Sequence, residues 1–217
     1  MATRRSVLAL AALIALALAL SLLLRGAGAP GHFIDKPGLV AEVHDDPQAP
    51  QGGAANGDLT IAVFTDYRCS VCRAEEGALQ RAAARDGRVR LVYKELAILG
   101  EPSVAAARAA LAADRQGVYA KVREALMAAP RIDGAALAGA FAGAGGDWAR
   151  AGGLVEQPDP ALQAVLDRTA REALQLGLAG TPGYLAGPLL VRGGVGDERA
   201  FARFFAAARA ARRDGRR

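Results

Sequence analysis

The fold of this chain is decided by residues 59–72, which read LTIAVFTDYRCSVC. Their first half, residues 59–65, is apolar and rich in β-branched side chains, a pattern typical of a buried strand. Residues 69–86 are rich in Ala, Glu and Arg and predict a helix that ends at a glycine. Residues 89–96 alternate apolar and basic side chains and predict a second strand. Strand, helix and strand in this order form a βαβ unit, so we expect the two strands to be parallel.

The second half of the chain begins with a long stretch that carries almost no strand signal, residues 101–177. Its helix-starting Asp and Pro residues predict a block of four or five helices. A sharp break at residues 180–183 follows. Two short apolar runs, 184–186 and 189–191, then predict a hairpin, and residues 197–210 predict a final helix. We therefore expect an α/β fold in which a helical insertion separates a βαβ half from a ββα half.

The N-terminal residues 1–29 are typical of a signal peptide or a membrane anchor. Arg4 and Arg5 precede an apolar run at residues 7–24, and small residues at 27–29 offer a cleavage site. The run is close to the length that crosses a bilayer, so either cleavage or retention is compatible with it. We expect a periplasmic or otherwise extracytoplasmic protein, either soluble after cleavage or anchored to the inner membrane by this run.

Two other segments are polar in composition. Residues 30–57 are rich in Pro, Gly, Asp and Gln and predict a linker or a loosely ordered lead-in to the domain. Residues 211–217 form a basic tail. Although Lys and Arg number 27 against 22 Asp and Glu, much of this excess lies in the leader and the tail. Interleaved basic and aromatic residues are not evident, so we expect no nucleic-acid partner.

Cys69 and Cys72 are the only cysteines of the sequence. A bond between them closes too small a loop to stabilise the fold much, which argues against a structural crosslink. A zinc site needs about four ligands, and the only histidines, His32 and His44, lie in the polar lead-in. We therefore expect neither a metal nor another cofactor. Two buried cysteines without chemistry remain an alternative, but export favours a pair that handles disulfides.

The cysteine pair lies where the buried strand gives way to the helix. Free backbone N–H groups and the helix dipole stabilise a thiolate at this position. We expect Cys69 to be the nucleophile and Cys72, one turn further along, to resolve a mixed disulfide. Glu95 and Asp66 are the acids expected near the pair, and either is a candidate acceptor of the Cys72 proton. The alternative is that Asp66 orders the loop and that Glu95 pairs with an arginine.

Three segments, taken together, resemble the DsbA-like thioredoxin-fold thiol–disulfide oxidoreductases of bacteria. They are FTDYRCSVC at residues 64–72, KELAILG at 94–100 and GTPGY at 180–184. The resemblance spans about residues 45–210. It implies a thioredoxin-like fold with a helical insertion between the two halves. The domain would comprise residues 58–100 and 178–210, and the insertion residues 101–177.

The resemblance also implies a function. It implies a cis bond at Thr181-Pro182 beside Cys69 and a backbone edge there that binds extended substrates. The implied partners are thiol-containing exported proteins and a membrane redox partner. Ser70 and Val71 stand where this family usually has Pro and an aromatic residue or His, so the direction of electron flow stays open. The alternatives to a dithiol oxidase are an isomerase or reductase kept reduced by a membrane partner and a non-enzymatic chaperone that uses the same groove.

Overall fold

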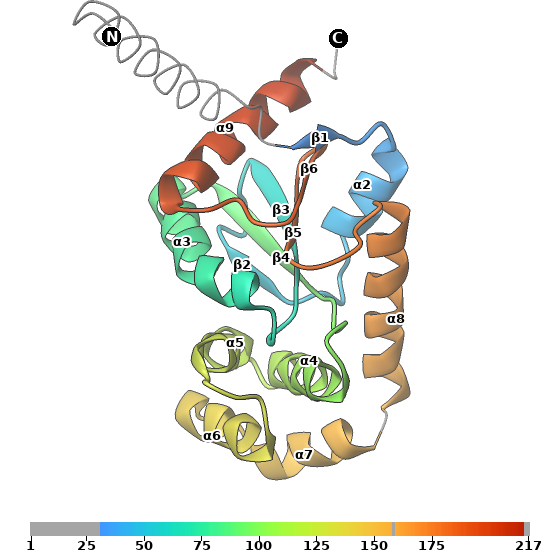
Figure 1. Ribbon diagram of the computed structural model, residues 1–217, viewed down its shortest axis with the longest axis vertical. Helices are drawn as coiled ribbons and strands as arrows, with labels where there is room; N and C mark the ends of the chain where they lie inside the picture. The colour runs from blue at the N-terminus through green and yellow to red at the C-terminus, as the bar shows by residue number, and fades with distance from the viewer. Residues whose placement is uncertain (1–30, 158, 215–217) are drawn as a thin grey trace, which may run out of the picture. The chain divides into compact units, whose positions relative to one another are not determined.

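The structure is a computed structural model, and it describes residues 31–157 and 159–214 (Figure 1). The predicted signal peptide or membrane anchor at residues 1–29 lies outside the described residues. Within the described ranges, none of the helices combines the length and the apolar character that a membrane crossing requires.

A six-stranded mixed sheet forms the centre of the domain, with the strand order β1-β6-β5-β3-β4-β2. β3 (Leu59–Thr65) and β4 (Val89–Glu95) are parallel, which confirms the predicted βαβ unit. β5 (Gly183–Ala186) lies antiparallel to β3 on its other side, and β6 (Leu189–Arg192) completes the predicted hairpin. β3 therefore occupies the middle of the sheet, where apolar side chains are needed on both faces.

The prediction of a linker or loosely ordered lead-in at residues 30–57 is wrong for the described residues 31–57. β1 (His32–Phe33) pairs with β6 and β2 (Gln51–Gly53) pairs with β4, so this segment supplies both edges of the sheet. α2 (Pro37–His44) lies between them in sequence and buries His44, whose Nε2 is 3.0 Å from the Leu185 carbonyl oxygen. A polar, Gly- and Pro-rich composition is compatible with short edge strands, because they need few apolar side chains.

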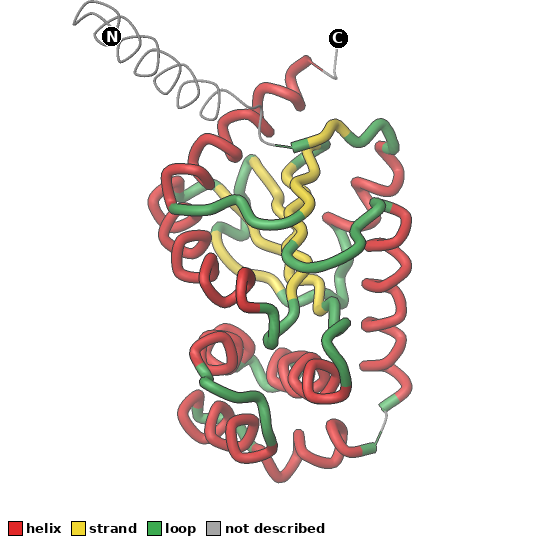
Figure 2. The backbone as a smooth tube through the Cα atoms, viewed as in Figure 1, coloured by secondary structure: helices red, strands yellow, loops and turns green. Residues whose placement is uncertain are grey.

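Helices cover both faces of the sheet. These helices are α2, α3 (Ser70–Asp86), α8 (Pro160–Gln175) and α9 (Glu198–Asp214). Ile61 and Val63 of β3 belong to the core that includes α3 and α9, whereas Ala62 and Phe64 belong to the core that includes α2 and the end of α8. Figure 2 shows the strands in yellow between these two layers. The alternation along β3 thus follows from the opposite directions of successive side chains in a strand.

The helical insertion lies beyond one end of the sheet (Figure 1). It contains α4 (Glu101–Asp114), α5 (Tyr119–Ala128), α6 (Gly134–Ala144) and α7 (Trp148–Glu156), and α8 leads back to the sheet. Asp133, Asp147 and Asp159 accept hydrogen bonds from backbone N–H groups at the starts of α6, α7 and α8. These caps satisfy donors that a helix leaves free, and they explain why the helix starts could be predicted.

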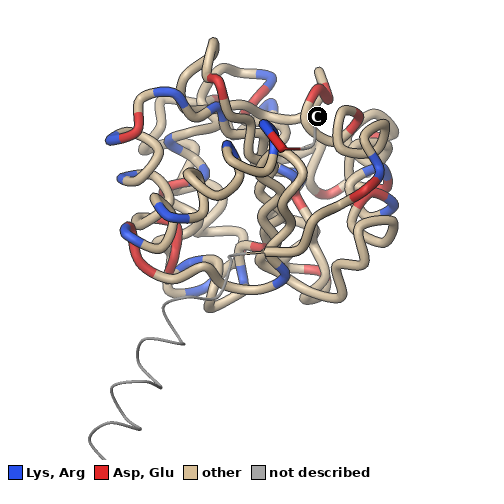
Figure 3. Tube along the Cα trace, turned by 90° about the horizontal axis from the view of Figure 1, so that it is seen from above, with Lys and Arg blue, Asp and Glu red and all other residues tan. Residues whose placement is uncertain are grey.

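Charges of both signs are interspersed around the described part of the chain in the view of Figure 3. Near the end of α9, Arg209 lies 2.6 Å from Asp58 and 2.8 Å from Asp86. These ion pairs hold α9 against the segment before β3 and the end of α3. The final helix continues to Asp214, beyond its predicted end at Ala210, so the first part of the predicted basic tail is helical.

A buried ion cluster joins the sheet to the layer formed by α2 and α8. The side chain of Lys94 in β4 is fully buried, and its Nζ lies 2.7 Å from Asp46 and 2.8 Å from Glu172. Arg168 adds a second cation 3.1 Å from Asp46. Since buried charges are costly when they lack a partner, this cluster makes the packing of α8 depend on Lys94.

We expect Lys94→Met to lower the free energy of unfolding by about 3–5 kcal/mol, because it leaves Asp46 and Glu172 buried without their shared cation. Urea denaturation measures the loss. Arg88→Met is the matched control, since Arg88 and Asp58 form an exposed ion pair and its loss costs at most about 1 kcal/mol. Equal losses in the two variants would contradict the proposed role of the cluster.

Candidate active site

The two cysteines lie at the N-terminus of α3. Cys69 is the N-cap residue of this helix, and its Sγ accepts a hydrogen bond of 3.2 Å from the backbone N–H of Cys72. Sulfur thus occupies the place that a Ser or Asp oxygen takes at most helix starts. Both cysteines are thiols in this structure and both are largely buried, with Cys69 7% and Cys72 3% exposed. The geometry places Cys69 outermost and Cys72 one turn inward, as the sequence predicts.

A cis peptide bond faces the cysteines. It joins Thr181 and Pro182 immediately before β5, as the family resemblance implies. The Cys69 thiol donates to the Thr181 carbonyl oxygen over 3.3 Å. The structure therefore brings together the pair Cys69 and Cys72 and the pair Thr181 and Pro182, and more than a hundred residues of the chain lie between the two pairs.

Burial, and after it the neighbouring Cys69, raise the pKa of the Cys72 thiol to about 12, although hydrogen bonds with the backbone of Asp66 and with Thr181 counteract part of this effect. Cys72 is therefore a thiol at neutral pH. If it is to attack a mixed disulfide, its proton must pass to another group as the sulfur reacts.

Asp66 orders the turn between β3 and α3. Its Oδ1 accepts hydrogen bonds from the Arg68 backbone N–H and the Ser103 hydroxyl, both 2.8 Å long. Its Oδ2 accepts from the backbone N–H groups of Ile98 and Leu99, at 2.9 and 3.1 Å. Both carboxylate oxygens are thus engaged in holding two loops together, which agrees with the loop-ordering alternative stated for this residue.

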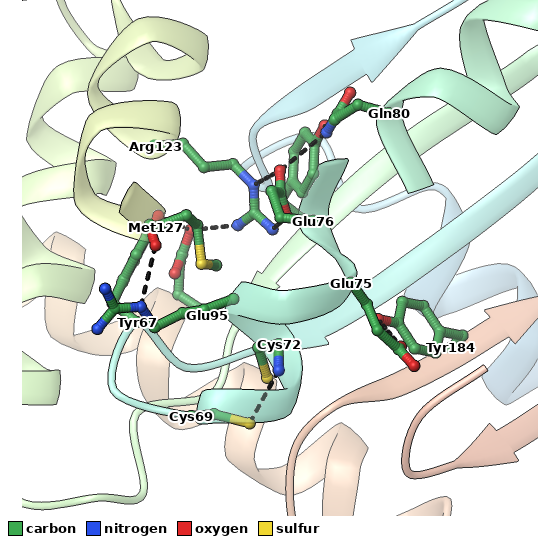
Figure 4. A network of polar contacts seen from close by, with 12 residues as sticks. Tyr67, Cys69, Cys72, Glu75, Glu76, Gln80, Glu95, Arg123, Met127 and Tyr184 are labelled. Carbon is green, nitrogen blue, oxygen red and sulfur yellow. Dashed lines mark hydrogen bonds and ion pairs between the residues drawn. The ribbon is translucent and has the colours of Figure 1, made fainter. Parts of the chain in front are cut away.

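Glu95 lies at the end of β4 in a buried polar network (Figure 4). Its Oε1 accepts hydrogen bonds from the hydroxyls of Tyr67, at 2.9 Å, and Tyr119, at 2.7 Å, and lies 4.0 Å from Nη1 of Arg123. Within the described residues its Oε2 has no hydrogen-bond partner. Burial raises the pKa of Glu95 to about 7, although Arg123 and the two tyrosines counteract part of this effect. This acid therefore changes its charge near neutral pH.

Arg123 was not singled out from the sequence, yet it connects the insertion to the cysteine helix. It is buried in α5, and its guanidinium binds both oxygens of Glu76 in α3, at 3.0 and 2.6 Å. It also stacks on Tyr93, 4.3 Å from the ring centre. Glu76 lies four residues after Cys72, on a face of α3 that the sequence alone does not assign to a partner.

A second arginine makes the connection in the opposite direction, from α3 to the insertion. Arg73 of α3 donates to the carbonyl oxygens of Met127 and Ala129 near the end of α5.

Exposed apolar side chains lie near the cysteine pair, at the start of α3 and in the loop before α4. Val71, between the two cysteines, is 43% exposed, and Ile98 and Leu99 are 47% and 42% exposed. The loop that carries Ile98 and Leu99 is held next to the turn before Cys69, because Arg68 donates to the Leu99 carbonyl oxygen and Asp66 accepts from both backbone N–H groups. We call Val71, Ile98 and Leu99 the apolar rim. An apolar surface at a reactive thiol is typical of a site that binds polypeptides.

A Cys-x-x-Cys pair at the start of a helix, directly beside a cis-proline in a thioredoxin-like fold, defines a thiol–disulfide oxidoreductase. Comparison with known families leads to the same class of protein. The sequence profile described as DSBA-like thioredoxin domain matches residues 60–201. The chain therefore belongs to the DSBA-like thioredoxin domain family, and it is a disulfide oxidoreductase of the DsbA type.

Solved structures resemble the chain over most of its length. A thioredoxin-like oxidoreductase from Silicibacter pomeroyi DSS-3 is 34% identical, with a TM-score of 0.72 over 80% of this chain and 97% of that one. A periplasmic thioredoxin-like protein from Salmonella enterica serovar Typhimurium is 26% identical, with a TM-score of 0.69 over 79% and 96%. The catalytic domain of Proteus mirabilis ScsC shares the fold at 20% identity and a TM-score of 0.68, over 78% and 94%. None of the curated proteins matches the chain.

The raised pKa of Glu95 makes stability depend on pH. The native state keeps a proton up to about pH 7 that the unfolded state releases above about pH 4.5. The contribution of Glu95 to the free energy of unfolding is therefore highest at low pH and falls as the pH rises through this window, by about 3 kcal/mol in total, because the buried carboxyl must then lose its proton. Glu95→Gln has no proton to lose at this position. We therefore expect the difference in free energy of unfolding between the variant and the unmodified protein to shift in favour of the variant by about 3 kcal/mol between pH 4.5 and 7.5.

Urea denaturation of both proteins across this pH range measures the difference, and the comparison cancels the titration of all other groups. Parallel stability curves for the two proteins would contradict the raised pKa of the buried acid.

Proposed function

We propose that this protein exchanges disulfides with exported polypeptides through a mixed disulfide at Cys69. The observation that carries the proposal is the position of the Cys69 sulfur, at the N-cap of α3 and 3.3 Å from the Thr181 carbonyl oxygen. There it meets both the groups that stabilise a thiolate and the edge at which a substrate backbone could pair.

The exchange follows from the two cysteines alone. When the enzyme is oxidised, a substrate thiolate attacks the Cys69 sulfur, the bond between Cys69 and Cys72 breaks, and Cys72 leaves and takes up a proton. A second substrate thiolate then attacks the substrate sulfur of the mixed disulfide and releases Cys69 as a thiolate. The substrate gains a disulfide and loses two electrons, which reduce the enzyme pair. The reverse sequence reduces or isomerises a substrate disulfide.

Thr181 and Pro182 are proposed to bind the substrate. The backbone at Thr181 lies just before the cis-proline and the start of β5, where it can pair with an extended peptide, and the peptide would then lie across the Cys69 sulfur. The apolar rim supports this role, because unfolded exported chains present apolar side chains that Val71, Ile98 and Leu99 can contact.

Glu95 is the favoured acceptor of the Cys72 proton. Its pKa of about 7 matches an acid that both takes up and releases protons near neutral pH, whereas each oxygen of Asp66 already accepts two hydrogen bonds from the surrounding loops. Asp66 acts by keeping the turn before Cys69 in place.

We further propose that the protein works outside the cytoplasm. The apolar run at residues 7–24, the presence of one close cysteine pair and the periplasmic relative from Salmonella support this location. Residues 1–29 would be removed after export or kept as an anchor. A membrane redox partner would restore the enzyme pair after each exchange.

A second candidate runs the same chemistry in the other direction, as an isomerase or reductase kept reduced by the membrane partner. Ser70 and Val71 are compatible with this direction, because they differ from the residues that the family usually has between the cysteines and the redox potential varies widely among such proteins. A measured potential near −120 mV would indicate an oxidase, and one near −270 mV a reductase.

Trapping of the intermediate tests the proposed roles of the two cysteines. We expect Cys72→Ser to accumulate a mixed disulfide with a peptide disulfide, because Cys69 attacks and no second thiol releases the product. Cys69→Ser should form no such adduct and should lose exchange activity. Mass spectrometry under non-reducing conditions identifies the adduct and the sulfur that carries it.

The double variant Cys69→Ser/Cys72→Ser provides the control for the chaperone alternative, since a chaperone would bind unfolded chains without either sulfur. Full exchange activity in Cys69→Ser, or an equal adduct on Cys72 in that variant, would show that the proposed roles are wrong.

A further inference from the structure

Glu75 points from the cysteine helix toward the strand that follows the cis-proline, on the opposite side of α3 from Arg123 (Figure 4). It lies three residues after Cys72 and is 7% exposed. Its Oε2 accepts hydrogen bonds from the Tyr184 hydroxyl, at 2.9 Å, and the Val195 backbone N–H, at 3.1 Å. Its Oε1 accepts from the Gly196 backbone N–H at 2.6 Å. One buried carboxylate thus binds three donors from outside its own helix.

All three donors belong to the part of the chain that carries the cis-proline. Tyr184 is in β5, two residues after Pro182. Val195 and Gly196 are in the loop after β6, and this loop is itself attached to the cis-proline, because the Gly193 N–H donates to the Pro182 carbonyl oxygen over 2.8 Å. Glu75 therefore joins the helix of the cysteines to the element of the cis-proline through both the strand and the loop.

The glycines of this loop are explained by its close approach to α3. A Cβ atom on Gly194 would lie 2.6 Å from Glu75 Oε1 and 3.1 Å from Cγ1 of Val71, which stands between the two cysteines. Gly193 and Gly196 have φ angles of 100° and 113°, which other residues rarely adopt. The loop is thus built to lie against the carboxylate.

We propose that Glu75 is a positioning residue that fixes the substrate-binding edge at Thr181 and Pro182 against the cysteine helix. The inference rests on the proposed function of that edge. The Cys69 sulfur is held independently, by the Cys72 N–H of its own helix. Loosening the Glu75 contacts would therefore displace the edge that binds a polypeptide and leave the sulfur pair in place.

The test compares two substrates of different size. Glu75→Gln replaces one acceptor oxygen with an NH₂ group, which cannot accept from the backbone N–H groups of the loop. We expect the KM for a synthetic peptide that carries two cysteines to rise about tenfold, a change of about 1.4 kcal/mol. The rate constant for exchange with dithiothreitol, which has no backbone to pair with the edge, should stay within a factor of about two.

Gly194→Ala is a second variant that leaves Glu75 unchanged. Its added methyl group would lie 2.6 Å from Glu75 Oε1, so the loop and the carboxylate must move apart, and we expect the same selective loss with the peptide. Tyr184→Phe removes one of the three donors and should give a smaller rise in KM. If Glu75→Gln does not fold, these two variants decide the question.

Glu172→Gln is the matched control, because Glu172 is also a buried glutamate that accepts a hydrogen bond, here from Lys94. It should leave the KM for the peptide unchanged. Equal losses with peptide and dithiothreitol in the Glu75 and Gly194 variants, unchanged KM values in both, or the same rise in Glu172→Gln would overturn the inference. Failure of the unmodified protein with both substrates would instead refute the proposed function.

Discussion

The backbone N–H of Cys72 donates a hydrogen bond to the Cys69 sulfur over 3.2 Å, and the surrounding structure depends on this contact. It makes the sulfur the N-cap of α3, so the reactive atom lies at the positive end of the helix dipole. β3 must end at Thr65 for the chain to turn into that cap, and Asp66 holds the turn by accepting four hydrogen bonds. The central strand and the cysteine helix therefore position one sulfur together.

Two consecutive acids of α3, Glu75 and Glu76, connect this helix to different parts of the domain. Glu76 binds Arg123 of the insertion, and the same arginine lies 4.0 Å from Glu95, the buried acid whose pKa is raised to about 7. Glu75 binds the strand that follows the cis-proline and the loop that is hydrogen-bonded to it. In the proposed function, the contacts of Glu76 would bear on proton transfer and those of Glu75 on substrate binding. The helical insertion would then take part in the site through Arg123 and its contacts with Glu76 and Glu95.

Much of the fold follows from local patterns. The apolar run before the cysteines, the alternation in β4 and the aspartate caps of the insertion are each visible within a few residues, and the structure confirms the elements they predict. The edge strands in residues 31–57 could not be found in this way, because two or three polar residues become a strand only when a partner edge is present.

The cysteine pair could be predicted from its motif and its place between a strand and a helix, whereas the cis bond at Thr181-Pro182 was implied only by the resemblance to a family. Glu75 and Arg123 could not be predicted, because their partners lie far away in the sequence and a charged residue on a helix is usually exposed. The glycines at 193, 194 and 196 are visible in the sequence, but their close approach to Glu75 is seen only in the structure.

Of the two sulfurs, only Cys69 should react readily with an external reagent at neutral pH, because it caps the helix on the outer side, whereas Cys72 lies one turn inward and keeps its proton. Alkylation of the reduced protein with iodoacetamide at neutral pH, followed by peptide mapping, measures this difference between the two cysteines. We expect Cys69 to be modified rapidly and Cys72, with its pKa of about 12, to remain a free thiol. Modification of Cys72 at the same rate as Cys69, or ahead of it, would contradict the account.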